Sequence, residues 1–592
     1  MVFNAPEDSS WAVWAVVSTL VAICLGQLYR SALPKPIPGV PYDEASSRKL
    51  LGDVPAMMDH MTRTQGGTFI TYILKTMRAL DAPLIQVFIR PFGKPLLILG
   101  DFPEAHDLLV RRKQFDRSHT LGDLVLGLAP DHHIHLETGD AWKTQRRLVQ
   151  DLMMPSFLHN VAGPALYQSV SAMIDLWREK AVLAAGRPWR ATDDVNQMAL
   201  DAITAFAFGE DFKHKATRPT LEAVRRIGKK VISAIRNAGI DESVVFPKCE
   251  EHATLRAIRD LTETVGEVQG NPFPGLTWAY ITRKSKIRRA IRLKEDCIAM
   301  ELRKGLERFE QTAGKVVKSA IDQMIIREHQ LAIKDGRAPD YFSRVMIDEQ
   351  FGFIFAGHET TSTTLCWSLK YLTDHPKAQE RLRASMQSAL LAAKAEKRNP
   401  TIQEITSTQI PYLDATIEET LRCAGTAPVV DRVATVDTEL LGHRVPKGTV
   451  VTCLVTGPTM KSPGFEIDIS RRSTSSRVAI EEGRVRAWRT DDIAAFDPGR
   501  WLVDNSTCGG TEADFDPTAG PQLAFGLGTR GCYGKRLVYL EMRIVLTLVV
   551  WNFELLPCPS SLSTYHSKLI TTNEPIQTYV RLRDIQAGYG GD

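Results

Sequence analysis

The sequence predicts a mainly α-helical fold with small β-sheets, preceded by one membrane-spanning helix. Helical spacing of apolar residues dominates from about Pro103 to Lys397, which is the pattern of amphipathic and buried helices. Alternating stretches rich in branched residues occur at 84–100, at 429–452 and again after Trp551, and such alternation predicts strands and hairpins. A charge-free apolar run near the N-terminus supplies the membrane-spanning element.

Composition and charge indicate an ordinary globular protein with no nucleic-acid partner. Of the 592 residues, 44% are hydrophobic and 24% are charged, which is a typical balance. A formal net charge of +4 is too mild to indicate nucleic-acid binding. The nine cysteines are scattered without a Cys-x-x-Cys pair, which argues against a disulfide scaffold and for a reducing compartment.

The first element is a transmembrane anchor predicted over residues 11–29. The stretch from Trp11 to Leu28 carries no charge, and at about 1.5 Å rise per residue it is just long enough to cross a hydrocarbon core. Trp14 and Tyr29 also stand toward its ends, where interfacial aromatic residues are favoured.

The charges beside this run predict its orientation. Glu7 and Asp8 precede it, whereas Arg30 and Lys35 follow it, and positive flanking charge favours the cytosolic side. Residues 1–10 are therefore expected in the lumen and the large domain in the cytosol. A cleaved signal peptide is the alternative, but it would need a basic segment before the apolar run.

A proline-rich hinge, residues 30–42, is expected between the anchor and one large domain, residues 43–592. Its run Pro34–Pro41 (PKPIPGVP) cannot be helical and forms a stiff spacer. Residues 462–492 are polar and contain six arginines, so we expect a surface insertion there. A charge run of this kind is usually a solvated face.

The most informative run is residues 525–534 (FGLGTRGCYG), in which glycines frame Cys532. Glycine lets the backbone turn tightly and approach a flat ligand closely. The apolar positions after Cys532 have helical spacing, so its sulfur is expected at a helix N-terminus, where a thiolate is favoured. A thiolate on such a loop is suited to bind haem iron. A buried structural cysteine is the alternative, because free cysteines are usually inert.

The pattern Phe-x-x-Gly-x-Arg-x-Cys-x-Gly resembles the haem-binding loop of the cytochrome P450 superfamily, the haem-thiolate monooxygenases. The resemblance extends over most of the chain from about Pro34 onward. It implies the cytochrome P450 fold for the catalytic domain, haem b as cofactor and Cys532 as the axial ligand of the iron. It also implies electrons from NADPH through NADPH–cytochrome P450 reductase, with cytochrome b5 as an optional second partner. The other loop residues implied at the cofactor are Phe525, Gly528, Arg530 and Gly534.

A second motif occupies residues 351–361 (FGFIFAGHETT) and continues into an apolar helix. Glycine, an acid and a hydroxyl are unfavourable choices inside such a helix, and threonine can bond back to a carbonyl one turn earlier. The motif resembles the distal, oxygen-activating helix of the family. This implies that Ala356 and Gly357 leave space over the iron, and that Glu359 and Thr360 relay protons.

A structural signature is implied for Glu419, Arg422 and Arg500. The first two stand at i,i+3 on one predicted helix, and alone they would form a weak surface pair. In the family, a Glu-x-x-Arg pair is buried and joined by an arginine from a downstream segment, which residues 496–501 (FDPGRW) match. These three residues are expected to hold the proximal side of the fold without taking part in the chemistry.

Haem propionates are the implied partners of Trp142, Arg146, Arg432 and Arg530. The indole N–H of Trp142 and the guanidinium of Arg146 stand at i,i+4, and both can donate to a carboxylate. The family uses this Trp-x-x-x-Arg pattern, and Arg432 and Arg530 match its two other propionate arginines. A surface amphipathic helix is the alternative for the Trp142 motif taken alone.

Electron delivery is expected at a basic patch on the cysteine side of the haem. Lys143 and Arg147 lie on the predicted Trp142 helix, and Lys535 and Arg536 follow Cys532. Such a patch would raise the encounter rate with an acidic reductase. A solvated face is the alternative for these charges.

The substrate pocket is expected from three segments, residues 119–137, 351–360 and 426–431. Their composition indicates a mainly apolar small-molecule substrate with some polar handles, such as a terpenoid or polyketide. The layout is similar to fungal members of secondary metabolism, which is an analogy. His358 is expected to be a neighbour of the site and not an iron ligand. The other expected pocket residues are Leu121, Val125, Leu126, Leu128, His132, His133, His135, Phe351, Phe355 and Val429.

The sequence therefore predicts a single-pass membrane enzyme of the endoplasmic reticulum that uses O2 and reductase-delivered electrons to oxidise an apolar organic substrate. A reductase-independent haem-thiolate isomerase or dehydratase is one alternative, and the intact Glu359–Thr360 pair argues against it. A non-catalytic haem-binding membrane sensor is the other, and the retention of every oxygen-activating position argues against it.

Overall fold

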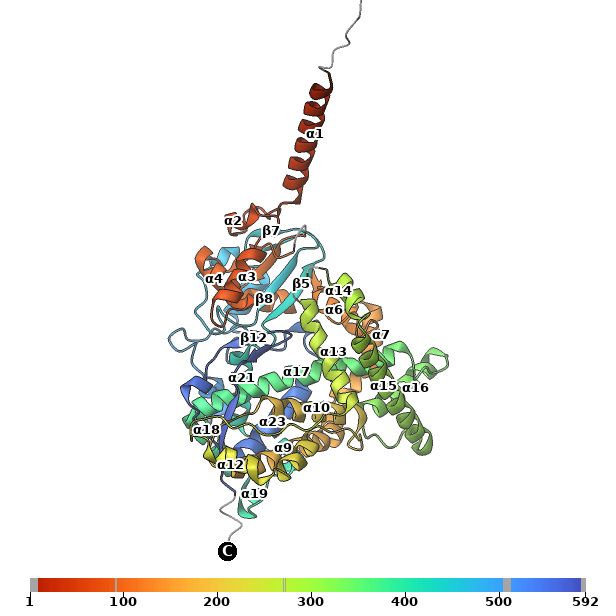
Figure 1. Cartoon of the computed structure of the whole chain (residues 1–592), viewed down its shortest axis with the longest axis vertical. Helices are drawn as coiled ribbons and strands as arrows, with labels where there is room; N and C mark the ends of the chain where they lie inside the picture. The colour runs from red at the N-terminus through yellow and green to blue at the C-terminus, as the bar shows by residue number, and fades with distance from the viewer. Residues whose placement is uncertain (1–8, 91–92, 270, 272, 504–512, 587–592) are drawn as a thin grey trace, which may run out of the picture.

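The computed structural model has a mainly α-helical body with small β-sheets, as predicted (Figure 1). Of the expected lumenal segment, residues 1–10, the first eight lie outside the described residues. The described residues are 9–90, 93–269, 271, 273–503 and 513–586.

Helices form most of the body. The first are α1 (Ser9–Ala32), α2 (Glu44–Ser47), α3 (Val54–Arg63), α4 (Phe69–Leu80), α5 (Phe102–Val110), α6 (Thr120–Asp123), α7 (Asp140–Val149) and α8 (Pro155–Phe157). The next are α9 (Gly163–Ala184), α10 (Thr192–Phe208), α11 (Thr217–Arg225), α12 (Lys229–Asn237), α13 (Ala253–Gln269), α14 (Pro274–Ile281), α15 (Ser285–Thr312) and α16 (Ala320–Asp335). The last are α17 (Arg344–Asp374), α18 (Pro376–Ala389), α19 (Leu391–Ala395), α20 (Ile402–Ser407), α21 (Pro411–Ala424), α22 (Thr474–Glu481) and α23 (Lys535–Asn552).

The strands confirm the three regions in which alternation predicts them. The main sheet has the order β1-β2-β8-β5-β3, with β2 and β8 parallel. The C-terminal tail supplies β11 and β14 of a second sheet, β11-β14-β4, and the hairpin β12–β13 lies between these two strands in the chain. The strands are β1 (Leu84–Val87), β2 (Leu96–Leu99), β3 (Phe115–Arg117), β4 (Trp189–Arg190), β5 (Val429–Ala434), β6 (Thr438–Leu440), β7 (His443–Val445), β8 (Val450–Leu454), β9 (Leu502–Val503), β10 (Asp514–Phe515), β11 (Phe553–Leu556), β12 (Ser567–Leu569), β13 (Asn573–Pro575) and β14 (Tyr579–Asp584).

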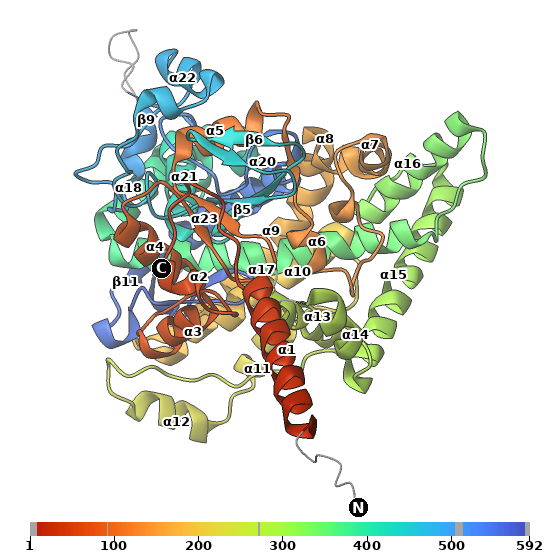
Figure 2. The ribbon, with the colours of Figure 1, turned by 90° about the horizontal axis from the view of Figure 1, so that it is seen from above.

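Helix α1 stands apart from the body, and Figure 2 shows the body from the side on which it projects. Among the described residues, Val13–Ala32 is the one helical segment long and apolar enough to cross a membrane, and none of its hydrophobic window is buried. Trp11 and Trp14 are 66% and 69% exposed. Apolar surface of this extent fits an apolar phase better than water.

The proline-rich segment is fastened to the body and is not a free spacer along its whole length. Gln86 on β1 accepts a hydrogen bond from the N–H of Ile37 at 2.7 Å. Its amide donates to the carbonyls of Ile37 and Val40 at 2.9 and 2.8 Å. Ile37 and Val40 are buried in a cluster with strands of the main sheet. The second half of the expected hinge is therefore a wall of the catalytic domain.

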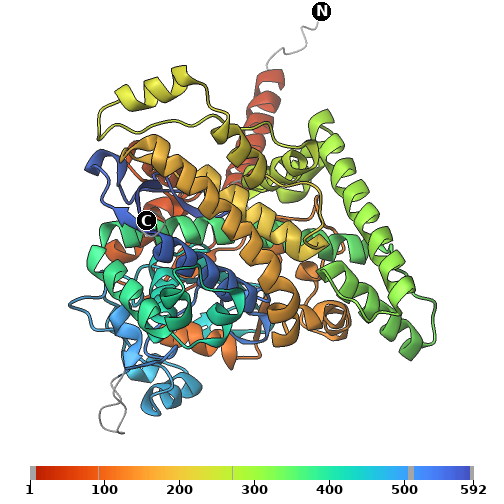
Figure 3. The same ribbon diagram turned by 90° about the horizontal axis from the view of Figure 1, so that it is seen from below.

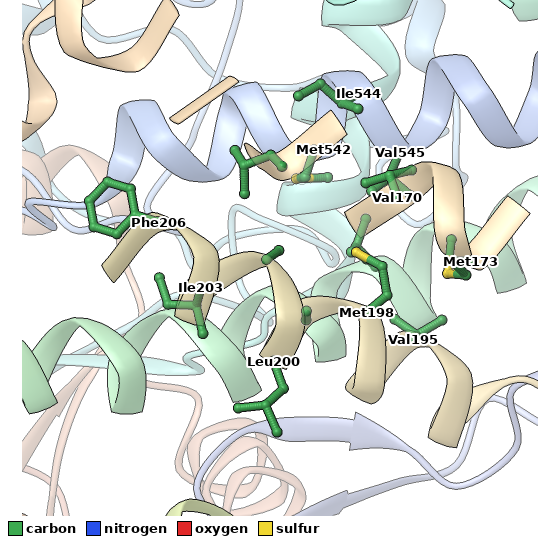
Figure 4. Close-up of a cluster of buried hydrophobic side chains, with 14 of the residues drawn as sticks. Val170, Met173, Val195, Met198, Leu200, Ile203, Phe206, Met542, Ile544 and Val545 are labelled. Atoms are coloured by element: carbon green, nitrogen blue, oxygen red, sulfur yellow. The ribbon is translucent and has the colours of Figure 1, made fainter. Parts of the chain in front are cut away.

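A long central helix, α17, crosses the middle of the body and is buried from Thr361 to Thr373 (Figure 1). Helices α9, α10 and α23 lie side by side when the molecule is seen from below (Figure 3). Their apolar side chains interlock in one core (Figure 4). The labelled members are Val170, Met173, Val195, Met198, Leu200, Ile203, Phe206, Met542, Ile544 and Val545.

The expected insertion, residues 462–492, is anchored at both ends and is not only a solvated face. Arg472 forms a bidentate pair with Asp101 at 2.6 and 2.9 Å, and the two side chains are 11% and 4% exposed. Trp488 is buried, with its ring centroid 4.7 Å from that of Trp501. Figure 2 shows α22 at the edge of the body beside α5. Ion pairing and aromatic packing therefore bind this charged segment to the fold.

Candidate active site

The cysteine motif forms a tight loop that leads into α23. The N–H of Cys532 donates to the carbonyl of Phe525 at 2.7 Å and closes the loop. Gly528 has a φ of +71°, and a Cβ there would lie 2.1 Å from the carbonyl oxygen of Leu109 on α5. Only glycine fits such a position. Because α23 begins at Lys535, the sulfur lies at a helix N-terminus, as predicted.

Solvent can reach part of Cys532, although many protein atoms lie around its sulfur. Burial raises the pKa of its thiol, while hydrogen bonds from the N–H groups of Gly534 and Lys535 act in the opposite direction. The positive charges of Arg117 and Arg146 also favour the thiolate. These groups would stabilise the sulfur once a metal ion replaces its proton.

Tyr533 joins the cysteine loop to two helices. Its ring centroid lies 6.1 Å from that of Phe353 on α17. The guanidinium carbon of Arg146 on α7 lies 3.6 Å from the same ring centroid. The Tyr533 hydroxyl donates to the carbonyl of Val149 at the end of α7. The residue next to Cys532 therefore marks the point where the cysteine loop, α7 and α17 meet.

One face of α17 turns toward this meeting point. Ala356 is exposed to solvent, although the helix turns that follow it are buried. The Thr360 hydroxyl donates to the carbonyl of Ala356 at 2.5 Å. Ala356 and Thr360 follow Phe353 at i+3 and i+7, so the three share one helix face. The structure thus places Ala356 and Thr360 on the side of α17 that faces the cysteine loop.

Glu359 turns away from Thr360 and toward the β12–β13 hairpin. The hydroxyl of Thr572 donates to its Oε1 at 3.4 Å and also lies 2.9 Å from the hydroxyl of Thr363. Burial, with a smaller contribution from the carboxylate of Glu574, raises the pKa of Glu359 to about 7. A carboxyl with this pKa can hold and release a proton near neutral pH.

Gly357 has a packing role in addition to the role expected from the sequence. A Cβ at this position would lie 2.6 Å from Cδ1 of Ile203 on α10, so the close approach of the two helices requires glycine. His358 faces α10 as well, with Nε2 3.2 Å from the carbonyl oxygen of Asn196. Burial lowers the pKa of His358 to about 4. On the side toward the cysteine loop, the small residue is Ala356.

Two of the predicted arginines flank the indole of Trp142. The guanidinium carbons of Arg530 and Arg146 lie 4.7 and 5.8 Å from its ring centroid. Arg530 donates to the carbonyl of Leu136 at 2.9 Å and to the hydroxyl of Thr138 at 3.3 Å. Nη1 of Arg146 is buried and has no hydrogen-bond partner among the described residues.

Arg432 and Arg117 extend the cluster from paired strands, where they lie directly opposite each other. Arg432 donates to the carbonyls of Asp431 at 2.8 Å and Leu527 at 3.4 Å. Nε of Arg117 is buried without a partner in the part of the chain that the structure describes. Sequence reasoning missed Arg117, since only its strand pairing with Arg432 brings it to this place.

These guanidiniums fit a ligand that carries carboxylates. Burial, together with neighbouring arginines, lowers the pKa of Arg117 and of Arg530 to about 10. Two buried guanidinium nitrogens, Nε of Arg117 and Nη1 of Arg146, have no hydrogen-bond partner among the described residues. The planar guanidinium group matches the geometry of a carboxylate. An accessible cysteine beside them can bind iron through its sulfur. The residues present therefore fit haem, a ligand that has both an iron and carboxylates.

The expected structural triad forms one buried network. Arg422 donates to the two carboxylate oxygens of Glu419 at 2.8 and 2.7 Å, and both side chains are fully buried. Arg500 donates to Glu419 at 3.0 Å, and the indole of Trp501 donates to it at 2.9 Å. Arg422 also donates to three backbone carbonyls, including that of Ile493 at 2.8 Å. A hydrogen-bonded charge network of this kind fixes the chain segments around it.

The apolar residues expected in the pocket differ in their exposure. Leu121 and Leu126 are 44% and 40% exposed, whereas Val125, Leu128 and Phe351 are buried. Phe355 and Val429 are half-buried. Some of the expected pocket residues are therefore accessible to solvent, and others lie inside the protein.

The three histidines expected in the pocket are already bonded within the protein. His133 Nδ1 lies 2.8 Å from Oε2 of Glu349, and His132 Nε2 lies 3.5 Å from the same atom. The ring of His135 bonds the carbonyl of Ala129 at 2.8 Å. The rings of these three expected pocket residues are therefore hydrogen-bonded or paired within the protein.

A mainly helical fold with a cysteine on a glycine loop, a threonine-bearing central helix and an arginine cluster defines a haem-thiolate protein. The family model described as Cytochrome P450 matches residues 82–460 and 492–580. The chain therefore belongs to the cytochrome P450 family. The unmatched stretch between the two segments nearly coincides with the insertion expected from the sequence.

Several relatives are fungal proteins named as monooxygenases. The chain is 40% identical to "Cytochrome P450 monooxygenase TRI13" of Fusarium sporotrichioides, over 96% of this chain and 98% of the relative. It is 34% identical to "Cytochrome P450 monooxygenase GME11363" of Pestalotiopsis microspora, over 98% of this chain and all of the relative. It is 44% identical to "Hps1-dma1 cluster cytochrome P450 monooxygenase cyp3.1" of Dothistroma septosporum, over 45% of this chain and 86% of the relative. The protein is thus a haem monooxygenase of the kind found in fungal secondary metabolism.

Proposed function

We propose that this monooxygenase is a membrane-anchored enzyme that oxidises an apolar secondary metabolite with electrons from a reductase. The observation that carries the proposal is the convergence of Cys532, the Ala356–Thr360 face of α17 and an arginine cluster with unpaired donors. When bound there, haem supplies the chemistry that activates dioxygen. The chain's own residues hold the haem, position the substrate and move protons.

The proposed roles follow the contacts. Cys532 holds the iron, and Phe525, Gly528 and Gly534 shape its loop. Trp142 and the arginines 146, 432 and 530 hold the propionates, and Arg117 joins them. The Glu419–Arg422–Arg500 network fixes the segment before the cysteine loop. These assignments rest on the packing and charge described for each side chain.

Proton delivery is proposed to use two separate side chains of α17. The hydroxyl of Thr360 lies on the haem side, where it can donate a proton after breaking its bond to the carbonyl of Ala356. Glu359, with its pKa near neutrality, is the proton reservoir behind it, reached from the hairpin through Thr572. This arrangement favours oxygen chemistry over a reductase-independent isomerisation or dehydration, which needs no proton supply to oxygen.

The substrate is proposed to be an apolar terpenoid or polyketide. Supporting this, the residues expected around the site are mainly apolar, and the histidines that would bind polar groups are already bonded to the protein. A relative whose name includes a cluster supports a place in secondary metabolism. The bonded histidines make a strongly polar substrate a poor fit.

The membrane arrangement is proposed from α1 and the charges around it. An exposed apolar helix with Arg30 and Lys35 on its C-terminal side favours a cytosolic catalytic domain, with residues 1–10 in the lumen. The endoplasmic reticulum is the proposed membrane, since NADPH–cytochrome P450 reductase is the proposed electron donor. Lys143, Arg147, Lys535 and Arg536 are exposed, which supports their use as the docking patch for that reductase.

The test is turnover of candidate metabolites. The full-length protein in membranes is incubated with a P450 reductase, NADPH and O2, and products are read by mass. We expect NADPH-dependent addition of one oxygen atom to an apolar terpenoid or polyketide. Product formation without NADPH would instead support the isomerase or dehydratase alternative.

A further inference from the structure

A fully buried carboxylate, that of Glu349 on α17, is hydrogen-bonded to the loop that leads into α7. It accepts hydrogen bonds from the backbone N–H of His133 at 2.8 Å and from Nδ1 of the same residue at 2.8 Å. The amide of Gln145 on α7 donates to it at 2.7 Å and also reaches the carbonyl of Asp131 at 2.5 Å. One side chain thus connects the loop, the central helix and the helix that carries Trp142.

Two neighbouring charges hold the same loop. The buried ammonium of Lys294 on α15 donates to the carbonyl of Leu128 at 2.9 Å. The N–H of Asp131 donates to the carboxylate of Asp348 at 2.9 Å, and Asp348 is fully buried. Burying three charges beside a loop is expensive unless each is bonded. All three charged side chains bond the backbone of this loop, which indicates that the fold holds the loop in one position.

The composition of the cluster would also suit a metal ion, because ligand atoms of His132, His133 and Glu349 lie within 4.8 Å of one another. The hydrogen bonds favour a clamp instead. The N–H of Ile134 donates to Nδ1 of His132 at 3.1 Å, so the proton of that ring is on Nε2, which points to Glu349. A protonated nitrogen offers no lone pair to a metal.

The clamped loop covers the same face of α17 that carries the oxygen-activating residues. Ala356 follows Glu349 at i+7, so both lie on one helix face two turns apart. Gly352 lies between them, and a Cβ there would be 2.2 Å from Nε2 of His132. Directly after the loop, the carbonyl of Leu136 accepts a hydrogen bond from the guanidinium of Arg530 at 2.9 Å.

We propose that Glu349 is a positioning residue that holds loop 128–135 over the distal side of the haem site and thereby sets how tightly bulky ligands bind. The inference rests on the proposed haem site at Cys532. A firmly held loop supplies a fixed surface, including the half-buried Ile134, to a large ligand. A small ligand that reaches only the iron is indifferent to the loop.

The test compares two azoles that bind haem iron through the same nitrogen, imidazole and the bulky clotrimazole. In Glu349→Gln, we expect the Kd of clotrimazole to rise about tenfold while that of imidazole stays within about twofold of wild type. Glu301→Gln is the control, because it removes another buried carboxylate, paired with Lys304 on α15. An unchanged ratio of the two dissociation constants in Glu349→Gln would overturn the proposal.

Milder variants keep the test decisive if Glu349→Gln does not fold. Gln145→Leu removes the link to α7 and should raise the ratio roughly threefold. Glu349→Asp keeps the charge, and we expect an intermediate ratio. A wild-type ratio in both variants would reject a positioning role.

Hydrogen exchange separates this inference from the proposed haem site. Loop 128–135 should exchange faster in Glu349→Gln than in Glu301→Gln, whether or not haem is present. Equal exchange would refute the clamp even if the reduced carbon monoxide spectrum verifies the thiolate ligand. Zinc offered in excess should leave wild-type exchange unchanged, and stoichiometric zinc bound only when Glu349 is intact would refute the clamp in favour of a metal site.

Discussion

The guanidinium carbon of Arg146 lies 3.6 Å from the ring centroid of Tyr533, the residue that follows Cys532. This cation–π contact, of about 0.5–2 kcal/mol, fixes Arg146 over the cysteine loop. Its buried Nη1 has no partner among the described side chains and backbone groups. The contact therefore prepares one donor for a ligand bound beside the sulfur.

Arg146→Leu should weaken haem retention, because a charge-assisted hydrogen bond of about 1.5–3 kcal/mol is lost. We expect haem to transfer to apomyoglobin at least roughly tenfold faster than from wild type. Arg147→Leu is the matched control, since Arg147 is exposed on the same helix. Equal rates of haem transfer from the two variants would show that Arg146 does not help to hold the haem.

Thr360→Ala should uncouple the enzyme without loss of haem. The Thr360 hydroxyl is on the face of α17 toward the cysteine loop, whereas that of the neighbouring Thr361 is buried without a partner in the described structure. Product per NADPH should fall roughly tenfold in Thr360→Ala, with peroxide rising to match, because a proton donor at the site is lost. Thr361→Ala should stay near wild type. The relay role is wrong if Thr360→Ala keeps its full product yield.

Glu359 should give the coupling efficiency a pH dependence near neutrality. Its pKa is raised from 4.5 to about 7, so the carboxyl is protonated below pH 7 and loses its proton as the pH rises through that value. Product per NADPH should therefore fall across this range in the wild type. Glu574→Gln should move the midpoint down, since the carboxylate of Glu574 contributes to the raised pKa. A Glu359→Gln variant with the wild-type pH profile would exclude Glu359 as the titrating group.

Charge reversal at Lys535 and Lys143 should slow electron delivery. Both side chains are exposed, and Lys143 pairs only at the surface, with Asp140 at 3.3 Å. The double variant Lys535→Glu with Lys143→Glu should be reduced on the order of tenfold more slowly at low ionic strength, and the difference should shrink with salt. Peroxide-driven turnover should not change.

The control for this prediction reverses two exposed lysines on α16 and α19, Lys334→Glu with Lys394→Glu. It makes the same change in net charge far along the chain from the cysteine loop. If both double variants are reduced at the same rate, net charge and not a docking patch governs the encounter.

Local motifs made the central parts of the site predictable. The loop around Cys532 and the Glu419–Arg422 pair are set by short runs whose residues fold next to each other. Arg117 could not be found in this way, because it reaches the site only by pairing β3 with β5. The close approach of Gly357 to Ile203 on α10 could not be found for the same reason.

The same limit explains the remaining differences. Gln86 fastens the proline-rich segment to the main sheet across a separation of nearly fifty residues. Glu349, on a helix more than two hundred residues away, pairs with the rings of His132 and His133. Periodicity predicts that such helices and strands exist, but it carries no information on which distant side chains they bring together.

The most direct test of this account is the carbon monoxide difference spectrum of the reduced protein, measured for wild type and for Cys532→Ala. A thiolate ligand gives the strongly red-shifted Soret band for which the family is named. We predict that band in the wild type and its loss in Cys532→Ala. Retention of the red-shifted band after removal of the Cys532 sulfur would contradict the assignment of the iron ligand and with it the proposed site.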